Sequence, residues 1–225
     1  MIVLLKFETF IKFRFNQDMS GRRKWIDWFL EQPRSILFVR IDDEFIINPF
    51  NFYGLKPLFF NFNEAYECLK RGNCCPHEDS DIEREVEVLY GLIHARYLLT
   101  RPGLQEMYEK FKEGVFQSCP RVLCKGCTCI PYGITEKPGE HKVKMFCPCC
   151  SDVYLCEEGC DYENIDGSYF GPSWVLMFLQ KYADQIAKRL PEKQPRVYVP
   201  KIFGFRLCHE SDREEYTSDE EDLSD

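Results

Sequence analysis

The sequence predicts an α+β fold, in which an all-helical N-terminal domain precedes a small three-stranded β domain. From Ile82 to Tyr97, apolar residues recur every three or four positions, as they do in an amphipathic helix. Between Cys119 and Cys150, short cysteine pairs alternate with turn residues and short apolar runs, which is typical of a metal-stabilised β domain. A C-terminal helix and an extended tail complete the expected architecture.

The expected boundaries are 1–24 for an extension, 25–114 for the helical domain, 115–172 for the β domain, 173–209 for the helix and tail, and 210–225 for an acidic disordered end.

The helical domain should begin with short elements. A short aromatic helix is expected from Trp25 to Leu30, a strand from Ser35 to Arg40, and helices that start at Asp42 and at Phe60. Residues 1–18 alternate apolar and basic side chains and differ in pattern from the rest of the chain, so Met19 is a second candidate for the start of the protein.

The long helix has clear signals at both ends. Ser80 and Glu83 have the spacing of a capping box at its start, and Pro102-Gly103 should end it. A second amphipathic helix should then run to Gly114.

The β domain should contain turns at Pro131–Gly133 and Lys137–Gly139 and strands at His141–Phe146 and Asp152–Leu155. Beyond it, Ser173 should cap a helix that runs to about Arg189. The tail after this helix contains two prolines among alternating apolar residues, so it is not expected to form a central strand of the protein's own sheet.

Composition narrows the classes of function. The 225 residues carry a formal net charge of −8, which argues against a general nucleic-acid-binding surface. The 13 cysteines are odd in number, and no secretory signal accompanies them, so a reducing compartment is favoured over a disulfide scaffold. No run approaches the roughly eighteen apolar residues of a membrane helix.

The cysteine spacing indicates a zinc ribbon, because two turns that each supply two thiolates give the tetrahedral site zinc prefers. Spacing alone leaves the ligands open. The pair Cys124/Cys127 would combine with Cys147/Cys150 at a standard spacing, Cys119/Cys124 is a second possible first pair, and Cys149 could replace a neighbour. A further site could include Cys156 and Cys160. With four thiolates the coordination sphere is closed, so the metal would be structural and not catalytic.

Several strings together resemble the regulatory (beta) subunit of casein kinase II, over about residues 25–209. They are Trp25–Phe29, Leu89–Thr100, Cys119–Cys124, Val143–Cys150, Asp166–Gly171 and Val199–Phe205. The resemblance implies one zinc ion held by Cys119, Cys124, Cys147 and Cys150, and no catalytic residues.

The resemblance also implies partners and a location. Family members dimerise through the ribbon and bridge two catalytic subunits into a heterotetramer in the cytoplasm and nucleus, where they modulate the stability, activity and substrate choice of the kinase. Protein substrates would be further partners, and neither nucleic acid nor membrane is expected. Apolar ribbon edges for the dimer are Pro120, Val122, Ile134, Val153 and Tyr154, and the docking residues are Ile202, Phe203, Phe205 and Arg206.

The chain departs from the family in places. The family commonly has Tyr where this chain has Phe203, and it often begins with a serine and acidic cluster where this chain has the basic run 20–24. The acidic stretch before the long helix is short, which puts binding of basic regulators there in doubt. An acidic acceptor sequence lies at Thr217 and Ser218 instead, so phosphorylation by the partner kinase is expected at Ser218 and also at Thr217.

Two other classes of function remain open alternatives. One is a zinc-ribbon protein of nucleic-acid binding or transcription assembly, against which the acidic charge counts. The other is a redox enzyme that uses Cys124/Cys127 or Cys147/Cys150, but neither pair comes after a strand and opens a helix.

Overall fold

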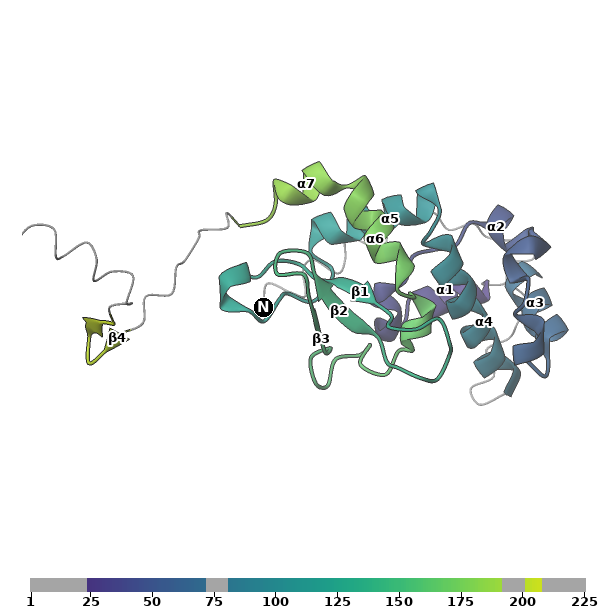
Figure 1. Ribbon diagram of the computed structural model, residues 1–225. Helices are drawn as coiled ribbons and strands as arrows, with labels where there is room; N and C mark the ends of the chain where they lie inside the picture. Colours follow the sequence, from purple (N-terminus) through teal and green to yellow (C-terminus); the bar gives the residue numbers. More distant parts are fainter. Residues whose placement is uncertain (1–23, 72–80, 192–200, 208–225) are drawn as a thin grey trace, which may run out of the picture. The chain divides into compact units, whose positions relative to one another are not determined.

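The computed structural model describes residues 24–71, 81–191 and 201–207 (Figure 1). The chain divides into two compact units, one ending at Pro191 and one beginning at Glu192, and each is described by itself. In the first unit the helices are α1 (Trp25–Leu30), α2 (Asp43–Ile47), α3 (Phe62–Arg71), α4 (Asp81–Tyr97), α5 (Arg101–Glu113), α6 (Ser173–Lys181) and α7 (Ala183–Ala187). Its strands are β1 (Ile130–Tyr132), β2 (Lys144–Cys147) and β3 (Asp152–Tyr154), and single turns of 3₁₀ helix cover Pro33–Leu37, Pro49–Phe52, Lys56–Leu58, Val122–Cys124 and Gly167–Tyr169. The predicted α+β fold is confirmed.

Helix α4 lies at the centre of the helical region, against α3 and the 3₁₀ turn Gly167–Tyr169. Of the periodic residues that predicted this helix, Val86, Leu89, Ile93 and Tyr97 are fully buried. The first of the series, Ile82, is exposed instead, because it lies in the first turn of the helix. The apolar stripe therefore predicted the buried face correctly from the second turn onward.

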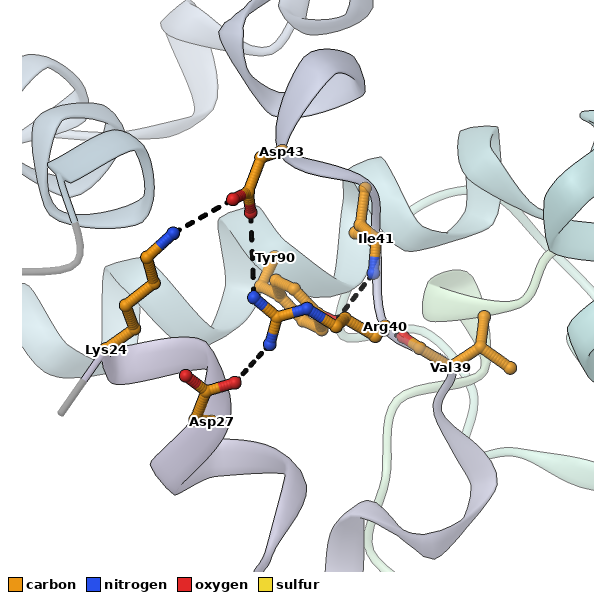
Figure 2. A network of polar contacts seen from close by, with 7 residues as sticks. All are labelled: Lys24, Asp27, Val39, Arg40, Ile41, Asp43 and Tyr90. Atoms are coloured by element: carbon orange, nitrogen blue, oxygen red, sulfur yellow. Dashed lines mark hydrogen bonds and ion pairs between the residues drawn. The ribbon is translucent and has the colours of Figure 1, made fainter. Parts of the chain in front are cut away.

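The strand predicted over residues 35–40 is wrong. Pro33–Leu37 is a 3₁₀ helix, and the extended segment after it pairs with side chains of α4 and not with another strand. The Tyr90 hydroxyl donates to the Val39 carbonyl at 2.9 Å and accepts from the Ile41 amide at 3.4 Å (Figure 2). Because a buried side chain satisfies these backbone groups, the apolar run is buried without a sheet.

Charged side chains at the surface join α1 to the start of α2, as Figure 2 shows. Arg40 lies between the carboxylates of Asp27 and Asp43, and the Lys24 ammonium is 2.9 Å from Asp43. These side chains are partly exposed, so each pair contributes at most about 1 kcal/mol. The network therefore connects α1 to the start of α2 but adds little to the stability of the fold.

The predicted helix boundaries need two corrections. Pro102 and Gly103 do not separate α4 from α5 but form the first turn of α5, where the missing Pro102 amide costs nothing. Thr100 caps that helix by accepting from the Gly103 amide at 3.2 Å. Gly114 ends α5 in the left-handed conformation, at φ 68°, as predicted.

The last predicted helix is two helices. The chain breaks at Tyr182, between α6 and α7, and the N-cap of α6 is Pro172 rather than Ser173. The predicted capping box at Ser80 lies outside the described residues.

The sheet is antiparallel in the order β1-β2-β3. Ile130 pairs with Phe146, and Met145 pairs with Tyr154. Pro131 lies inside β1 instead of in the predicted turn, which an edge strand tolerates. Just after β1, the backbone at Gly133 lies close to the backbone at Gly167. A Cβ added to Gly133 would lie 1.9 Å from the Gly167 carbonyl oxygen, so this position requires glycine.

Candidate metal centre

Four cysteine thiols converge at one end of the sheet. The Sγ atoms of Cys119, Cys124, Cys147 and Cys150 all lie within 4.8 Å of one another, and those of Cys119 and Cys150 are 4.0 Å apart. The first three side chains are buried, and Cys150 is partly buried. Sulfur ligands about 2.3 Å from a tetrahedral ion lie about 3.8 Å from each other. The spacing of these thiols therefore fits a metal site with four cysteine ligands.

The first pair is positioned by a tight turn. Cys124 ends the 3₁₀ helix that begins at Val122, and Lys125 is the next residue, in the left-handed conformation at φ 48°. The Cys119 amide donates to the Cys127 carbonyl at 2.8 Å. This bond closes the segment on itself, so that both thiols of the pair face the same side.

The second pair lies in the connection between β2 and β3. Cys147 is the last residue of β2, and the Ser151 amide donates back to its carbonyl at 2.9 Å. Ser151 has φ 58°, which reverses the chain into β3. The side chain of Gln117 joins the two halves, because its Nε2 donates to the Leu155 carbonyl at 3.2 Å and its Oε1 accepts from the Glu157 amide at 3.1 Å.

Burial and hydrogen bonds shift the pKa values of the thiols at the centre. Burial raises the pKa of the Cys124 thiol and also raises that of Cys147. At Cys150 burial raises the pKa too, but hydrogen bonds from Tyr154 and Cys147 outweigh it and lower the pKa to about 7. Several thiols packed together without a counterion hold their protons. A divalent cation removes these protons and balances the thiolate charge, which is how structural metal sites form.

Three further cysteines lie in the same domain but outside the four-thiol group. Cys127 and Cys149 are partly buried, and Cys129 is fully buried. The spacing alternative that used Cys127 as a ligand is not the arrangement found, because Cys119 takes that place in the four-thiol group. In the sequence, spacing made Cys127 and Cys149 alternative ligands, and no signal singled out Cys129.

The residues predicted for a dimer interface lie on the surface of the ribbon. Val122 is 89% exposed, and Pro120, Ile134 and Val153 are exposed as well. Tyr154 is partly buried, with its hydroxyl 3.2 Å from the Cys150 thiol. The first four are therefore not core residues of the ribbon, and Tyr154 packs against the metal centre.

The residues predicted for docking form a hairpin in the second unit. Strand β4 (Lys201–Ile202) pairs antiparallel with β5 (Phe205–Arg206). The two turn residues have positive φ, 49° at Phe203 and 87° at Gly204, as in the two-residue turns that join hairpin strands. Phe203 is 96% exposed and Phe205 is 79% exposed, and Ile202 and Arg206 are exposed as well.

Other candidate residues have no part in the metal centre. Thr217 and Ser218 lie outside the described residues. His94, which is fully buried, accepts a hydrogen bond from the Val39 amide and lies 2.8 Å from the Tyr169 carbonyl, so it is a core residue and not an exposed base. No helix in the described ranges is long and apolar enough to cross a membrane.

A helical region joined to a small β domain with four clustered cysteines defines an α+β protein with a possible metal site. An exposed aromatic hairpin is a further feature of the described residues. The family model of the casein kinase II regulatory subunit matches residues 24–206. The chain belongs to this family, whose members are non-catalytic regulatory subunits.

Individual relatives agree with the family model. The chain is 36% identical over 194 residues to casein kinase II subunit beta of Dictyostelium discoideum, covering 84% of this chain and 70% of the relative. It is 39% identical over 190 residues to casein kinase II subunit beta' of Saccharomyces cerevisiae, covering 81% and 72%. It is 38% identical over 194 residues to casein kinase II subunit beta of Schizosaccharomyces pombe, covering 84% and 81%.

Proposed function

We propose that this chain binds one zinc ion through Cys119, Cys124, Cys147 and Cys150, dimerises through the zinc ribbon, and docks two catalytic casein kinase II subunits through its C-terminal hairpin. The observation that carries the proposal is the convergence of four thiols in a chain of this family. The assembled protein would work in the cytoplasm and nucleus, where it modulates the stability, activity and substrate choice of the kinase.

Zinc is the ion that fits the donor set. Four thiolates are soft ligands, and zinc accepts them in tetrahedral geometry without a redox change. A sphere with four thiolates leaves no position for water, so the ion would hold the turns in place and would not perform chemistry. Cys119 and Cys124 would hold it from one turn, and Cys147 and Cys150 from the other.

The dimer proposal rests on apolar side chains exposed beside the metal centre. Val122 and Leu123 lie on the first turn, and Val153 and Leu155 lie on β3 or just after it, all of them at least 40% exposed. A two-fold axis through such a surface buries the same residues from both copies. The turn and β3 both depend on the metal centre, so the metal would fix the shape of this surface.

The docking proposal rests on the hairpin. A short turn presents Phe203 at its tip, and Phe205 stands on the strand beside it. Exposed aromatic side chains on a small rigid segment are typical anchors, and removing one from a partner pocket commonly costs about 2 kcal/mol or more. The hairpin would therefore supply most of the binding energy for a catalytic subunit.

We also propose that the kinase phosphorylates Ser218, and Thr217 as well, because the acidic run 219–222 directly follows this pair. A phosphopeptide map of the co-expressed complex tests this. Phosphate on either residue is the expected result. A complete map in which neither residue carries phosphate contradicts the proposal.

Two pairs of substitutions separate the two proposed surfaces. Phe203→Ala with Phe205→Ala should lower the affinity for the catalytic subunit at least about thirtyfold, while zinc content and dimer mass stay unchanged.

Val122→Asp with Val153→Asp should give a zinc-containing monomer, because burying the new carboxylates at the interface is unfavourable.

The matched control replaces two exposed phenylalanines of the helical region, Phe50→Ala with Phe60→Ala, which are 82% and 100% exposed. This control should bind the catalytic subunit as the unchanged chain does. Equal loss of binding in the hairpin variant and in the control would contradict docking through the hairpin. A dimeric mass for the Val122/Val153 variant would contradict the proposed interface.

A further inference from the structure

A small cleft in the first unit is lined by positively charged side chains from three separate parts of the chain. It has a volume of about 280 Å³, and its cations are Lys112 on α5, Lys125 on the first turn of the ribbon and Arg189 after α7. No aspartate or glutamate is among the described residues that line it. Because the chain as a whole carries a formal net charge of −8, this local excess of positive charge is not a general property of its surface.

The C-terminal end of α5 would ordinarily repel an anion, because the last carbonyl groups of a helix carry partial negative charge. Here hydrogen bonds occupy these carbonyls. The Gly114 amide donates to the Phe111 carbonyl at 3.2 Å, and the Arg189 guanidinium donates to the Lys112 carbonyl at 3.2 Å. A guanidinium has five N–H groups, so this bond holds Arg189 in place and leaves other donors for a ligand.

Lys112 is held at the cleft by two contacts on its own helix. Its ammonium group pairs with the Glu109 carboxylate and lies 5.1 Å from the centre of the Tyr108 ring. The ion pair is partly exposed to solvent and therefore weak. Since an ammonium group has three N–H donors, Lys112 can bind an anion without leaving Glu109.

The ribbon turn supplies the third cation and two backbone amides. Lys125 is exposed, and Gly126 after it has φ 73°. Apart from the chain neighbours of Gly126, no atom of the described residues lies within 4 Å of a Cβ added there, so a ligand can approach its backbone. In the described part of the chain, the amides of Gly126 and Thr128 have no hydrogen-bond partner. Unpaired amides beside lysine and arginine are typical of sites for phosphoryl groups.

The metal centre borders the cleft through Cys124. Four thiolates and one divalent ion would carry two negative charges, and the three cations of the cleft outnumber them. The Cys124 side chain is buried, whereas Lys125 and Arg189 are exposed, so an anion from solvent meets the cations first. The cleft therefore remains a positively charged site when the metal is bound.

We propose that this cleft binds phosphoserine in an acidic protein segment. A phosphoserine side chain carries a charge of about −2 and three acceptor oxygens, which suit the three cations and the free amides. A nucleic acid fits less well, because its backbone requires an extended basic surface. The inference rests on the proposed function, because the segments bound would be substrates that the kinase has already phosphorylated, and the cleft would retain them on the assembled enzyme.

The first experiment measures binding to the zinc-saturated full-length chain by fluorescence anisotropy. The probe is a labelled synthetic peptide in which phosphoserine is followed by glutamates. The same peptide without the phosphate should bind at least about tenfold more weakly, because the charge-assisted hydrogen bonds to the phosphate are lost. Equal binding of the two peptides, or no binding of the phosphopeptide, overturns the proposal.

Two competitors identify the source of the phosphoryl group. Inorganic phosphate and a short single-stranded oligonucleotide should each displace the phosphopeptide only at much higher concentrations than the unlabelled phosphopeptide does. Equal competition by inorganic phosphate would make free phosphate the ligand, and stronger competition by the oligonucleotide would make it a nucleic acid. Either result overturns the assignment to a protein segment.

Substitutions place the phosphopeptide in the cleft. Lys112→Gln with Lys125→Gln and Arg189→Gln should weaken its binding at least about tenfold. The matched control is Lys56→Gln with Lys137→Gln and Lys142→Gln, which removes the same charge from exposed positions outside the cleft. The control should bind within about twofold of the unchanged chain, since general electrostatic attraction is screened by salt. Equal losses in the two variants overturn the cleft as the site.

A measurement on the unsubstituted chain covers the case in which the cleft variant does not fold. In ¹⁵N NMR spectra, addition of the phosphopeptide should shift the amide signals of Gly126 and Thr128 and the side-chain signal of Arg189. Shifts confined to other parts of the chain overturn the proposal.

The hairpin variant separates this inference from the proposed function. Phe203→Ala with Phe205→Ala should bind the phosphopeptide as the unchanged chain does. An unchanged chain that binds the phosphopeptide but not the catalytic subunit overturns the proposed docking and leaves the cleft as a phosphoserine site. The opposite result overturns the inference alone.

Discussion

At the scale of single residues, His94 shows how the core of the helical region holds an ionisable side chain neutral. The ring is fully buried on α4, where its Nε2 accepts from the Val39 amide at 3.1 Å and its Nδ1 donates to the Tyr169 carbonyl at 2.8 Å. Burial is the main cause that lowers the pKa of His94 from 6.5 to about 3, against the opposing effect of the Tyr169 hydrogen bond. A charged imidazole would have no acceptor at Nε2, so the neutral ring suits both partners.

This pKa makes the fold sensitive to acid. The unfolded chain binds a proton at His94 below pH 6.5 and the folded chain does not until about pH 3. The contribution of His94 to stability is therefore complete above pH 6.5 and falls as the pH falls between these values. Each pH unit in that range removes about 1.4 kcal/mol, or about 2 kcal/mol at pH 5. Urea midpoints of zinc-saturated protein between pH 5 and 7 measure this.

The comparison for this prediction is His94→Gln, which has no proton to gain and should show a shallower loss with falling pH. His141→Gln replaces an exposed histidine of the ribbon and should keep the original pH dependence. Parallel curves for the unchanged chain and His94→Gln would contradict the role given to His94.

Gly91 illustrates a close contact that outweighs helix propensity. An added Cβ at this position on α4 would lie 2.3 Å from the ring of Tyr169. In an open helix, replacing Gly by Ala adds about 1 kcal/mol of stability, but overpacking a core costs about 1–3 kcal/mol. Gly91→Ala should therefore destabilise the protein, as measured by urea unfolding at pH 7. In a Tyr169→Ala background the same substitution should be neutral or stabilising, and an equal cost in both backgrounds would refute this explanation.

At the scale of elements, local patterns predicted the helices and failed where distant partners decide the structure. The α4 stripe and the Gly114 stop are local features, and the structure has both. The run 35–40 has the composition of a strand, but its backbone partners are Tyr90 and His94, about fifty residues further along the chain. No local pattern contains that information. Likewise, spacing left the first cysteine pair open, because the hydrogen bond from the Cys119 amide to the Cys127 carbonyl is not visible in the spacing.

The C-terminal hairpin gives a prediction at this scale. Gly204 has φ 87°, a conformation that costs a β-branched residue about 1–2 kcal/mol. Gly204→Val should therefore weaken binding of the catalytic subunit about tenfold, although both phenylalanines remain. Gly204→Asn is the matched control, since Asn tolerates positive φ, and it should bind more tightly than Gly204→Val. Titration calorimetry measures both affinities, and unchanged binding by Gly204→Val would show that the turn has no part in docking.

At the scale of the whole molecule, one hydrophobic core extends from the helical region into the ribbon, and a bound metal would add to its stability. The helices bury an aromatic core around α4, in which Trp25, Phe29 and Tyr90 contact one another. The ribbon has a small sheet, and much of its folding energy would come from the metal, on the order of 10 kcal/mol for a structural zinc ion. Removal of the metal should therefore unfold the ribbon first.

This order of unfolding can be checked with a strong chelator. Complete metal removal should convert the dimer into a monomer while most of the helical circular dichroism signal remains. Readdition of zinc under reducing conditions should restore the dimer. A chain that stays dimeric after complete metal removal would contradict the proposed link between metal and dimerisation.

The proposed molecule is a metal-dependent dimer with a hairpin that docks a kinase subunit. The most direct test is the native mass of the complex formed when this chain and a catalytic casein kinase II subunit are produced together and purified. We predict a mass of two copies of this chain, two catalytic subunits and the bound zinc. A complex with one copy of this chain, or recovery of this chain without the catalytic subunit, would contradict the proposed assembly.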